Sequence, residues 1–262
     1  MSGTPSKYYK LAIGEGLEAL LAKDYNHSFP FHFHPTYNIT LVYLGSFNTQ
    51  LHNQLLIAPT GSILITNPQE IHANPFEKDN KVSFFTFYVS QDFMEYCNGG
   101  QSVVFNNKVI NDDDLFSALH QLATTINHPQ LGSTYEDELK KALHTLALNY
   151  GDNHNEPQDL QFKSLFDDFM AEESITKFSL DVAASRFGID KYKFIRLFKS
   201  QTGLTPNNYF ILKRIEKSKT MLAEGKDLLS IAIDLGFYDT AHYCNHFKKF
   251  TGISPIAYST NI

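Results

Sequence analysis

Three histidines in the first third of the chain carry side chains that can bind a metal ion or a small molecule. His32 and His34 are one residue apart, and His72 follows a run of short apolar segments. Neutral imidazole is a ligand for zinc, copper, nickel and iron, so the three rings could hold a metal. They can equally line a pocket for an organic molecule or serve only in strand pairing. We expect the organic pocket, and we expect no metal and no cofactor.

A second group of chemically able side chains lies in the last third of the chain, inside an internal repeat. Residues 198–209 reappear as residues 247–258, with Phe-Lys, Thr-Gly, Pro and Tyr at matching positions. Upstream of each copy an alanine precedes a glycine by four residues, Ala184 before Gly188 and Ala232 before Gly236. This pattern is typical of a helix-turn-helix. The alanine is a small residue where two helices cross, the glycine permits the turn, and an apolar-periodic helix follows. The sequence therefore predicts two such units, and the exposed face of each second helix is the predicted reader of DNA bases.

Short local signals mark where the predicted helices begin and end. Asp190 and Asp239 stand at the N-cap of the second helix of each unit. A Thr-Gly pair ends each of these helices, and a proline opens the helix that follows. Residues 206–223 then form a central helix of about 18 residues, roughly 27 Å long.

Charge divides the chain into an acidic and a basic part. Residues 1–159 contain 8 Lys, no Arg and 17 acidic residues, a net charge of −9, whereas residues 160–262 contain 11 Lys, 3 Arg and 11 acidic residues, a net charge of +3. The three arginines, Arg186, Arg196 and Arg214, lie in the basic part, where a planar charged fork suits phosphate and guanine. DNA would repel the acidic part, which therefore has another task.

Length and composition bound the class of protein. The chain has 262 residues, 42% of them hydrophobic and 14% aromatic, which supports about two globular domains. It contains no apolar run of signal-peptide or membrane-span length, so we expect a cytoplasmic protein with no membrane partner. Cys97 and Cys244 are too few for a disulfide scaffold or a cysteine metal cage, and we expect buried or partly buried thiols.

The two parts of the chain differ in their predicted elements. Short apolar runs at residues 37–43, 46–51, 54–57, 62–66 and 81–89 predict an all-β barrel or sandwich. Two amphipathic helices follow at residues 112–127 and 134–150, whose apolar stripes either cover the sheet or pair with a second subunit. The polar run 151–159 indicates a linker. The predicted fold class is α+β multidomain, with a β barrel and helical pair followed by an all-α domain.

Residues from about 175 to 259 closely resemble the DNA-binding domain of the AraC/XylS family of bacterial transcription regulators. The features that carry the resemblance are the duplicated helix-turn-helix, the Gly236-Phe237 pair and the Phe-Lys, Thr-Gly, Pro, Tyr endings. The resemblance implies two recognition helices in successive major-groove segments, joined by the central helix. A rod of that length suits recognition helices about one DNA turn, roughly 34 Å, apart.

On the family pattern, Tyr192, Ile195 and Arg196 of the first reader face bases. Arg196 is the strongest candidate, because arginine bound to guanine by two hydrogen bonds is the commonest specific contact, worth roughly 1 to 3 kcal/mol of discrimination. The alternative is a phosphate-bound or solvated arginine. In the second reader, Asn245 stands where many relatives have arginine, so this half reads a different base or contributes less affinity. The predicted DNA-binding residues are Lys191, Tyr192, Lys193, Ile195, Arg196, Lys199, Thr240, Ala241, His242, Cys244, Asn245 and Lys248.

The histidine segment, with Gly45, Gly61 and Pro68, resembles a degenerate pair of cupin motifs, and cupin-like barrels are frequent sensor domains in the AraC/XylS family. The resemblance implies a cupin-like barrel with a ligand in its mouth. In metal-binding cupins a glutamate completes the histidine ligands, but this position is Asn38 here. The predicted ligand-binding residues are Phe31, His32, His34, Tyr37, His72, Phe85 and Phe87, although the strand register that would place them is not set by the sequence.

The predicted function is a sequence-specific DNA-binding transcription regulator of the AraC/XylS type, not an enzyme, controlled by a small molecule in the barrel. One alternative is a regulator without a small-molecule effector, whose barrel serves assembly or protein contacts. Another is a metal-dependent cupin enzyme with a DNA-binding tail. The predicted domains are 1–150, a linker 151–159 and 160–262. The expected partners are double-stranded DNA and a small-molecule effector, with RNA polymerase and a second copy of the chain as further candidates.

Overall fold

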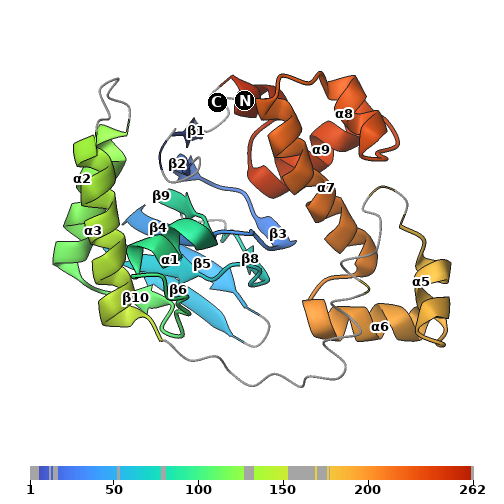
Figure 1. The fold of residues 1–262 in the computed structure, drawn as a ribbon, viewed down its shortest axis with the longest axis horizontal. Coiled ribbons are helices and arrows are strands. Elements are labelled where there is room, and N and C mark those ends of the chain that lie inside the picture. Colours follow the sequence, from blue (N-terminus) through green and yellow to red (C-terminus); the bar gives the residue numbers. More distant parts are fainter. Residues whose placement is uncertain are drawn as a thin grey trace. The chain divides into compact units, whose positions relative to one another are not determined.

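The computed structural model divides the chain into two compact units, which we describe separately (Figure 1). It describes residues 6–11, 13, 17–51, 54–77, 81–126, 133–152, 169, 176 and 178–260. The described residues up to 152 belong to the first unit, and those from 169 onward belong to the second. Within these ranges, every helix is too short or too polar to span a membrane.

Two antiparallel sheets form the first unit. The larger sheet has the strand order β1 (Lys7–Lys10), β2 (Glu18–Tyr25), β9 (Val82–Val89), β4 (Tyr37–Leu44), β7 (Ile63–Thr66) and β10 (Val109–Ile110). The smaller sheet has the order β3 (Phe29–His32), β8 (His72–Asn74), β5 (Ser46–Gln50) and β6 (Leu55–Pro59). The sheets pack face to face, as the contact between the rings of Phe47 and Phe84, 4.5 Å between centroids, shows.

The central strands β4 and β9 have two buried faces of different chemistry. Side chains alternate across a strand, and the register pairs Ile39 with Phe87 and Thr40 with Thr86. Ile39 and Phe87 belong to the apolar core on the outer face of the larger sheet. The hydroxyls of Thr40 and Thr86 form a buried hydrogen bond of 2.9 Å on the opposite face, which is the face that Phe84 turns toward the smaller sheet. The space between the sheets is therefore partly polar.

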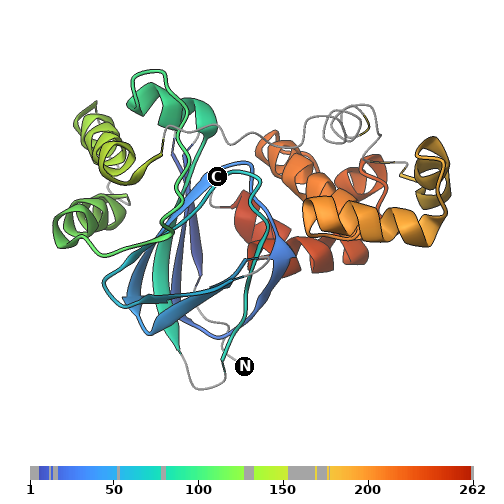
Figure 2. The ribbon, with the colours of Figure 1, turned by 90° about the horizontal axis from the view of Figure 1, so that it is seen from below.

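Three helices cover the outer face of the larger sheet (Figure 2). They are α1 (Gln91–Cys97), α2 (Asp113–Thr125) and α3 (Ser133–Tyr150). Leu119 of α2 and Leu143 of α3 are fully buried in the same core as Ile39. The predicted apolar stripes of α2 and α3 thus cover the sheet, which is the first of the two uses that the sequence allowed.

The second unit is all helical over its described residues. Its helices are α5 (Leu180–Arg186), α6 (Lys191–Thr202), α7 (Pro206–Ala223), α8 (Leu228–Asp234), α9 (Thr240–Thr251) and α10 (Pro255–Ser259). The predicted central helix corresponds to α7, residue for residue. The pairs α5 with α6 and α8 with α9 contact each other as the two helices of a helix-turn-helix.

The sequence repeat is also a repeat of contacts. The rings of Phe198 and Tyr209 lie 5.5 Å apart, and those of Phe247 and Tyr258 also lie 5.5 Å apart. In both copies the threonine of the Thr-Gly pair donates a hydrogen bond of 2.8 Å to the carbonyl of that phenylalanine. The glycine that follows is left-handed in both copies, with φ of 71° and 80°. The repeated residues therefore serve the helix ends and the core.

The start of the predicted linker belongs to the first unit. Gly151 donates its backbone N–H to the carbonyl of Ala147 at 2.9 Å, and Asp152 forms a backbone bridge with Val104. Residues 153–159 of the predicted linker, and 160–168 of the predicted second domain, lie outside the described residues. Gly151 and Asp152 are thus part of the first unit, and the division between the two units falls within the predicted linker.

Candidate functional site

Helix α6 exposes most of its candidate DNA-binding residues and buries its two phenylalanines. Phe194 and Phe198 are 1% and 0% exposed and pack in the core of the second unit. Tyr192 is 65% exposed, and Arg196 is exposed on the same helix. Ile195 is half-buried, so part of its side chain is committed to packing. The remaining candidates on α6 are exposed: Lys191, Lys193 and Lys199.

Helix α9 exposes a smaller share of its candidate DNA-binding residues than α6 does. Ala241, Asn245 and Lys248 are exposed, whereas Thr240, His242 and Cys244 are half-buried. The ring of His242 lies 4.5 Å from that of His246, and its Nδ1 accepts a hydrogen bond from the backbone of Tyr238 at 3.4 Å. Burial raises the pKa of the Cys244 thiol. The predicted face of α9 therefore includes three residues that are partly engaged inside the unit.

Aspartates begin both recognition helices. The Asp190 carboxylate accepts backbone hydrogen bonds of 2.9 Å from Tyr192 and Lys193, and Asp239 accepts one of 2.6 Å from His242. The hydrogen bond from Lys193, followed by that from Tyr192, holds the pKa of Asp190 below its usual range. Both N-cap predictions are confirmed, and the caps fix the first turn of the two helices that carry the predicted DNA-binding residues.

The three arginines of the second unit have different surroundings. Arg214 is half-buried and donates to the carbonyl oxygens of Gly236 at 2.8 Å and Thr176 at 3.4 Å. The guanidinium of Arg186 lies 5.5 Å from the ring centre of Phe169. Arg196 is the arginine that projects from the exposed face of a recognition helix. The structure thus distinguishes Arg196 from Arg214, whose guanidinium group donates hydrogen bonds to backbone carbonyl oxygens.

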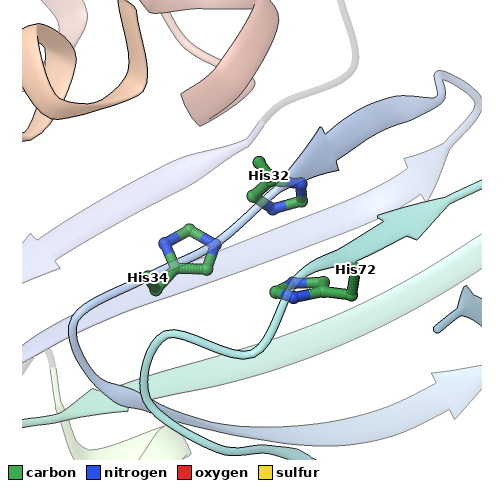
Figure 3. A group of neighbouring side chains, drawn as sticks. All are labelled: His32, His34 and His72. Carbon is green, nitrogen blue, oxygen red and sulfur yellow. The ribbon is translucent and has the colours of Figure 1, made fainter. Parts of the chain in front are cut away.

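The three histidines of the first unit lie together (Figure 3). One ring nitrogen from each of His32, His34 and His72 lies within 4.8 Å of those of the other two. His32 and His72 are paired across β3 and β8, and their ring centroids are 4.3 Å apart. His34 comes from the loop after β3, and its ring also contacts Tyr88 at 5.3 Å. Burial lowers the pKa of His72, which favours the neutral imidazole.

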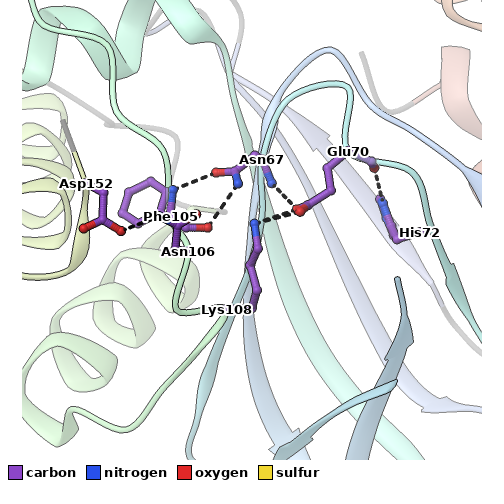
Figure 4. Close-up of polar contacts among 7 residues, drawn as sticks. All are labelled: Asn67, Glu70, His72, Phe105, Asn106, Lys108 and Asp152. Atoms are coloured by element: carbon purple, nitrogen blue, oxygen red, sulfur yellow. Dashed lines mark hydrogen bonds and ion pairs between the residues drawn. The ribbon is translucent and has the colours of Figure 1, made fainter. Parts of the chain in front are cut away.

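A network of polar contacts reaches His72 on the Nδ1 side of its ring (Figure 4). The Nδ1 atom of His72 lies 2.8 Å from the carbonyl oxygen of Glu70. The Glu70 carboxylate is held by the buried Lys108, at 2.8 Å, and by the backbone N–H of Asn67, at 2.9 Å. The Asn67 side chain in turn bonds the backbone N–H and carbonyl of Phe105, at 3.0 and 3.1 Å. These residues were missed by sequence reasoning, because their contacts join positions up to 38 residues apart.

Four predicted pocket residues do not face the histidines. Tyr37, Phe85 and Phe87 lie on the outer face of the larger sheet in the core with the helices, and the Tyr37 hydroxyl donates to the carbonyl of Val103 at 2.6 Å. Phe31 is 41% exposed and alternates with the buried His32 along β3. The structure therefore does not bring these four side chains together with the histidines, because neighbouring residues of a strand point to opposite faces.

Other side chains occupy that space instead. Asn38 and Thr40 of β4, with Thr86 and Tyr88 of β9, lie on the face of the larger sheet that His34 contacts through Tyr88. The signal that could have found them is a pair of polar residues two positions apart in an otherwise apolar strand, at 38 and 40 in β4 and at 86 and 88 in β9. Asn38, at the position of the cupin glutamate, is buried and accepts a hydrogen bond from Thr36 at 3.2 Å.

A two-sheet domain with an internal histidine cluster, combined with a duplicated helix-turn-helix unit, defines a DNA-binding regulator that carries a ligand-binding domain. The chain belongs to the AraC family of transcription regulators. Residues 16–149 match the AraC-like ligand binding domain, and residues 183–261 match a helix-turn-helix domain. The predicted family, fold class and regulatory function are confirmed.

Relatives along most of the chain are described as transcription regulators. YbfI of Bacillus subtilis, described as an uncharacterized HTH-type transcriptional regulator, is 26% identical over 234 residues, which cover 86% of this chain and 85% of the relative. The HTH-type transcriptional activator RhaS of Escherichia fergusonii is 24% identical over 245 residues, 87% of this chain and 86% of the relative. These descriptions agree with the expectation of a regulator rather than an enzyme.

Solved structures of ToxT from Vibrio cholerae share the fold. An apo ToxT variant aligns with a TM-score of 0.58 at 14% identity, over 99% of this chain and 98% of ToxT. Wild-type ToxT bound to an unsaturated fatty acid aligns with a TM-score of 0.56 at 14% identity, over 100% and 98%. At this identity the likeness shows the fold alone.

Proposed function

We propose that this regulator reads two adjacent DNA sites with α6 and α9, and that Arg196 supplies a base contact in the first. The observation that supports the proposal is the exposed face of α6, where Arg196 stands beside Tyr192 with Lys193 and Lys199 close by. Lysines at these positions suit phosphate contacts, which place the helix, whereas the arginine fork suits a guanine edge. The corresponding contacts from α9 come from Ala241, Asn245 and Lys248, with His242 and Cys244 partly covered.

We further propose that an effector binds in the first unit and changes the DNA affinity of the second. ToxT, which shares the fold, binds an unsaturated fatty acid, and this supports control by a small ligand. The acidic residues 1–159, with a net charge of −9, are poorly suited to DNA and suit a sensing task. As part of this proposal, the protein acts in the cytoplasm and has no enzymatic activity, and a linker joins its sensing unit to its DNA-binding unit. RNA polymerase and a second copy of the chain are its proposed protein partners.

The experiment that tests DNA reading compares Arg196→Ala with the parent protein. A DNA site is selected from a random pool with the full-length chain, and affinities are measured by fluorescence anisotropy on that site and on every single-base variant. We expect Arg196→Ala to bind the selected site roughly tenfold to a hundredfold more weakly and to lose discrimination at one base position, the effect of about 1 to 3 kcal/mol for a bidentate pair.

The matched control is Lys217→Ala, which removes an exposed cation from α7 rather than from a recognition helix. This variant should keep the base preferences of the parent protein. Equal weakening of Arg196→Ala on all sequences would mean that Arg196 holds a phosphate, and it would contradict the proposed base contact.

A further inference from the structure

We infer that His32, His34 and His72 bind one divalent transition-metal ion, and that this ion is the effector of the first unit. The inference rests on the proposed function of the first unit as an effector-binding domain, and it names the chemical class of the effector. It is carried by the geometry of the three rings, by the groups that orient them and by the absence of a carboxylate from the cluster that the described residues form.

The spacing of the rings is close to what a metal requires. The three ring nitrogens lie within 4.8 Å of one another, and the rings surround a common point (Figure 3). A tetrahedral ion with bonds of about 2.1 Å to nitrogen holds its ligand atoms roughly 3.4 Å apart. Each pair of nitrogens therefore needs to approach by no more than about 1.4 Å. Small rotations of the rings supply this movement, and His34 lies in a loop rather than in a strand.

Backbone carbonyls set the tautomer of two of the rings. The Nδ1 atom of His32 is 2.7 Å from the carbonyl oxygen of Pro30, and that of His72 is 2.8 Å from the carbonyl oxygen of Glu70. Because a carbonyl oxygen can only accept, Nδ1 is the donor in both rings, and in the neutral form of each ring Nε2 is the nitrogen that can ligate an ion. Proteins commonly orient metal-binding histidines in this way, with one ring nitrogen donating to a carbonyl and the other ligating the ion.

Strand pairing alone does not account for the cluster. His32 and His72 are cross-strand partners, so the pairing of β3 with β8 brings their two rings together. His34 is outside both strands, yet its ring centroid lies 4.8 Å from that of His32 and 5.6 Å from that of His72. One ion bound by all three rings would explain why the ring of His34 lies against the buried pair.

The donor set indicates which ions fit. The nearby Glu70 carboxylate is engaged by Lys108 and by the backbone of Asn67, and Asn38 presents a carboxamide rather than an acid. Three neutral nitrogens suit zinc, nickel, copper or ferrous iron, whereas magnesium and calcium require oxygen ligands. The net charge of −9 on residues 1–159 also favours the approach of a cation. Three protein ligands leave a coordination position for water or another small ligand.

The test is a metal titration of the full-length protein after treatment with a chelator. Zinc chloride and nickel chloride are titrated by calorimetry, with magnesium chloride as the ion that should not bind, and bound metal is counted by mass spectrometry after dialysis. We expect one zinc or nickel ion per chain. His34→Ala and His72→Ala should each weaken binding at least a hundredfold. The control, His27→Ala, removes an exposed histidine of the same unit and should bind as the parent protein does.

Folding is checked separately, since a buried histidine can also support the structure. The partly buried His34 is additionally replaced in His34→Gln, and each variant must show the circular dichroism spectrum of the metal-free parent. Folded variants that still bind zinc as tightly as the parent protein would overturn the site. Failure of the parent protein to take up either ion would do the same.

DNA affinity measured on the selected site, with and without zinc, separates the two proposals. A zinc-dependent change of at least fivefold, lost in His34→Ala, supports the ion as effector. DNA binding without any zinc uptake overturns the inference and leaves the regulator intact. Zinc uptake in a chain that binds no DNA overturns the proposed function and leaves the metal site. Zinc bound with unchanged DNA affinity refutes the effector role.

Discussion

At the scale of single residues, the turn glycines of the two helix-turn-helix units offer a matched pair. Gly188 and Gly236 have φ of 63° and 70°, which an L side chain adopts at a cost of about 1 to 2 kcal/mol. A Cβ at Gly188 would meet nothing within 4 Å, whereas one at Gly236 would lie 2.6 Å from the carbonyl oxygen of Thr176. Arg214 donates to that oxygen and to the carbonyl of Gly236, so Thr176 is held in place.

We therefore expect Gly236→Ala to destabilise the second unit more than Gly188→Ala. Gly188→Ala should lower the free energy of unfolding by about 1 to 2 kcal/mol, and Gly236→Ala by at least about 1 kcal/mol more, because overpacking adds to the strained φ. Urea unfolding followed by far-ultraviolet circular dichroism measures both. Equal losses would mean that the segment at Thr176 moves aside.

Residue types in local motifs were predictable, and residues in long-range contacts were not. The caps Asp190 and Asp239 and the left-handed glycines depend on backbone conformation within a few residues, so the sequence alone located them. The pairing of Glu70 with Lys108 joins positions 38 residues apart, and no local pattern marks it. The same holds for the hydrogen bonds from Arg214 to the carbonyl oxygens of Gly236 and Thr176, which lie 22 and 38 residues away.

At the scale of elements, the cap of α6 predicts a pH dependence of stability. Backbone hydrogen bonds, first from Lys193, lower the pKa of Asp190 in the folded chain. A depressed pKa means that the carboxylate stabilises the fold above its unfolded pKa, about 3.9, and that this contribution disappears as the pH falls through the lower folded pKa. The negative charge at the helix N-terminus adds to the effect of the cap.

Asp190→Asn isolates this contribution, since asparagine keeps the cap acceptor but does not ionise. We expect the parent protein to melt at a higher temperature than Asp190→Asn at pH 7, and the difference to shrink as the pH falls below about 4. Asp190→Ala, which lacks the cap acceptor, should be the least stable of the three at pH 7. A difference between parent and Asp190→Asn that is independent of pH would show that the charge of Asp190 plays no part.

The order and type of most elements followed from periodicity, but the faces of the central strands did not. The predicted strands at residues 37–43 and 81–89 match β4 and β9, yet both strands are buried on two sides. The predicted pocket includes Tyr37, Phe85 and Phe87, and the structure places these side chains in the core beneath the helices. The polar Thr40 and Thr86 mark the inner face, and only the register between strands makes that visible.

At the scale of the whole molecule, a series of contacts joins His72 of the histidine cluster to Asp152. Asn67 connects the Glu70 segment to Phe105, and both neighbours of Phe105 contact Asp152: Val104 through a backbone bridge, and Asn106 through a hydrogen bond of 2.9 Å (Figure 4). Asp152 is the last residue that the structure describes before the segment leading to the second unit. This series of contacts is a physical connection between the proposed effector site and Asp152.

Asn67→Ala tests whether the effector acts through this connection. The substitution removes both side-chain bonds to the Phe105 backbone but keeps the backbone N–H that Glu70 accepts, so zinc affinity should change less than threefold. The ratio of DNA affinities with and without zinc should fall toward one. Two sites are coupled only when both change the equilibrium of a shared structural element, and the substitution disconnects the proposed one. Asn98→Ala, which removes a local amide bond to Gln101 at 2.9 Å, is the control and should keep the parent ratio. If Asn67→Ala also keeps it, the effector reaches the second unit by another route, and the contacts at Asp152 serve only to hold the end of the first unit.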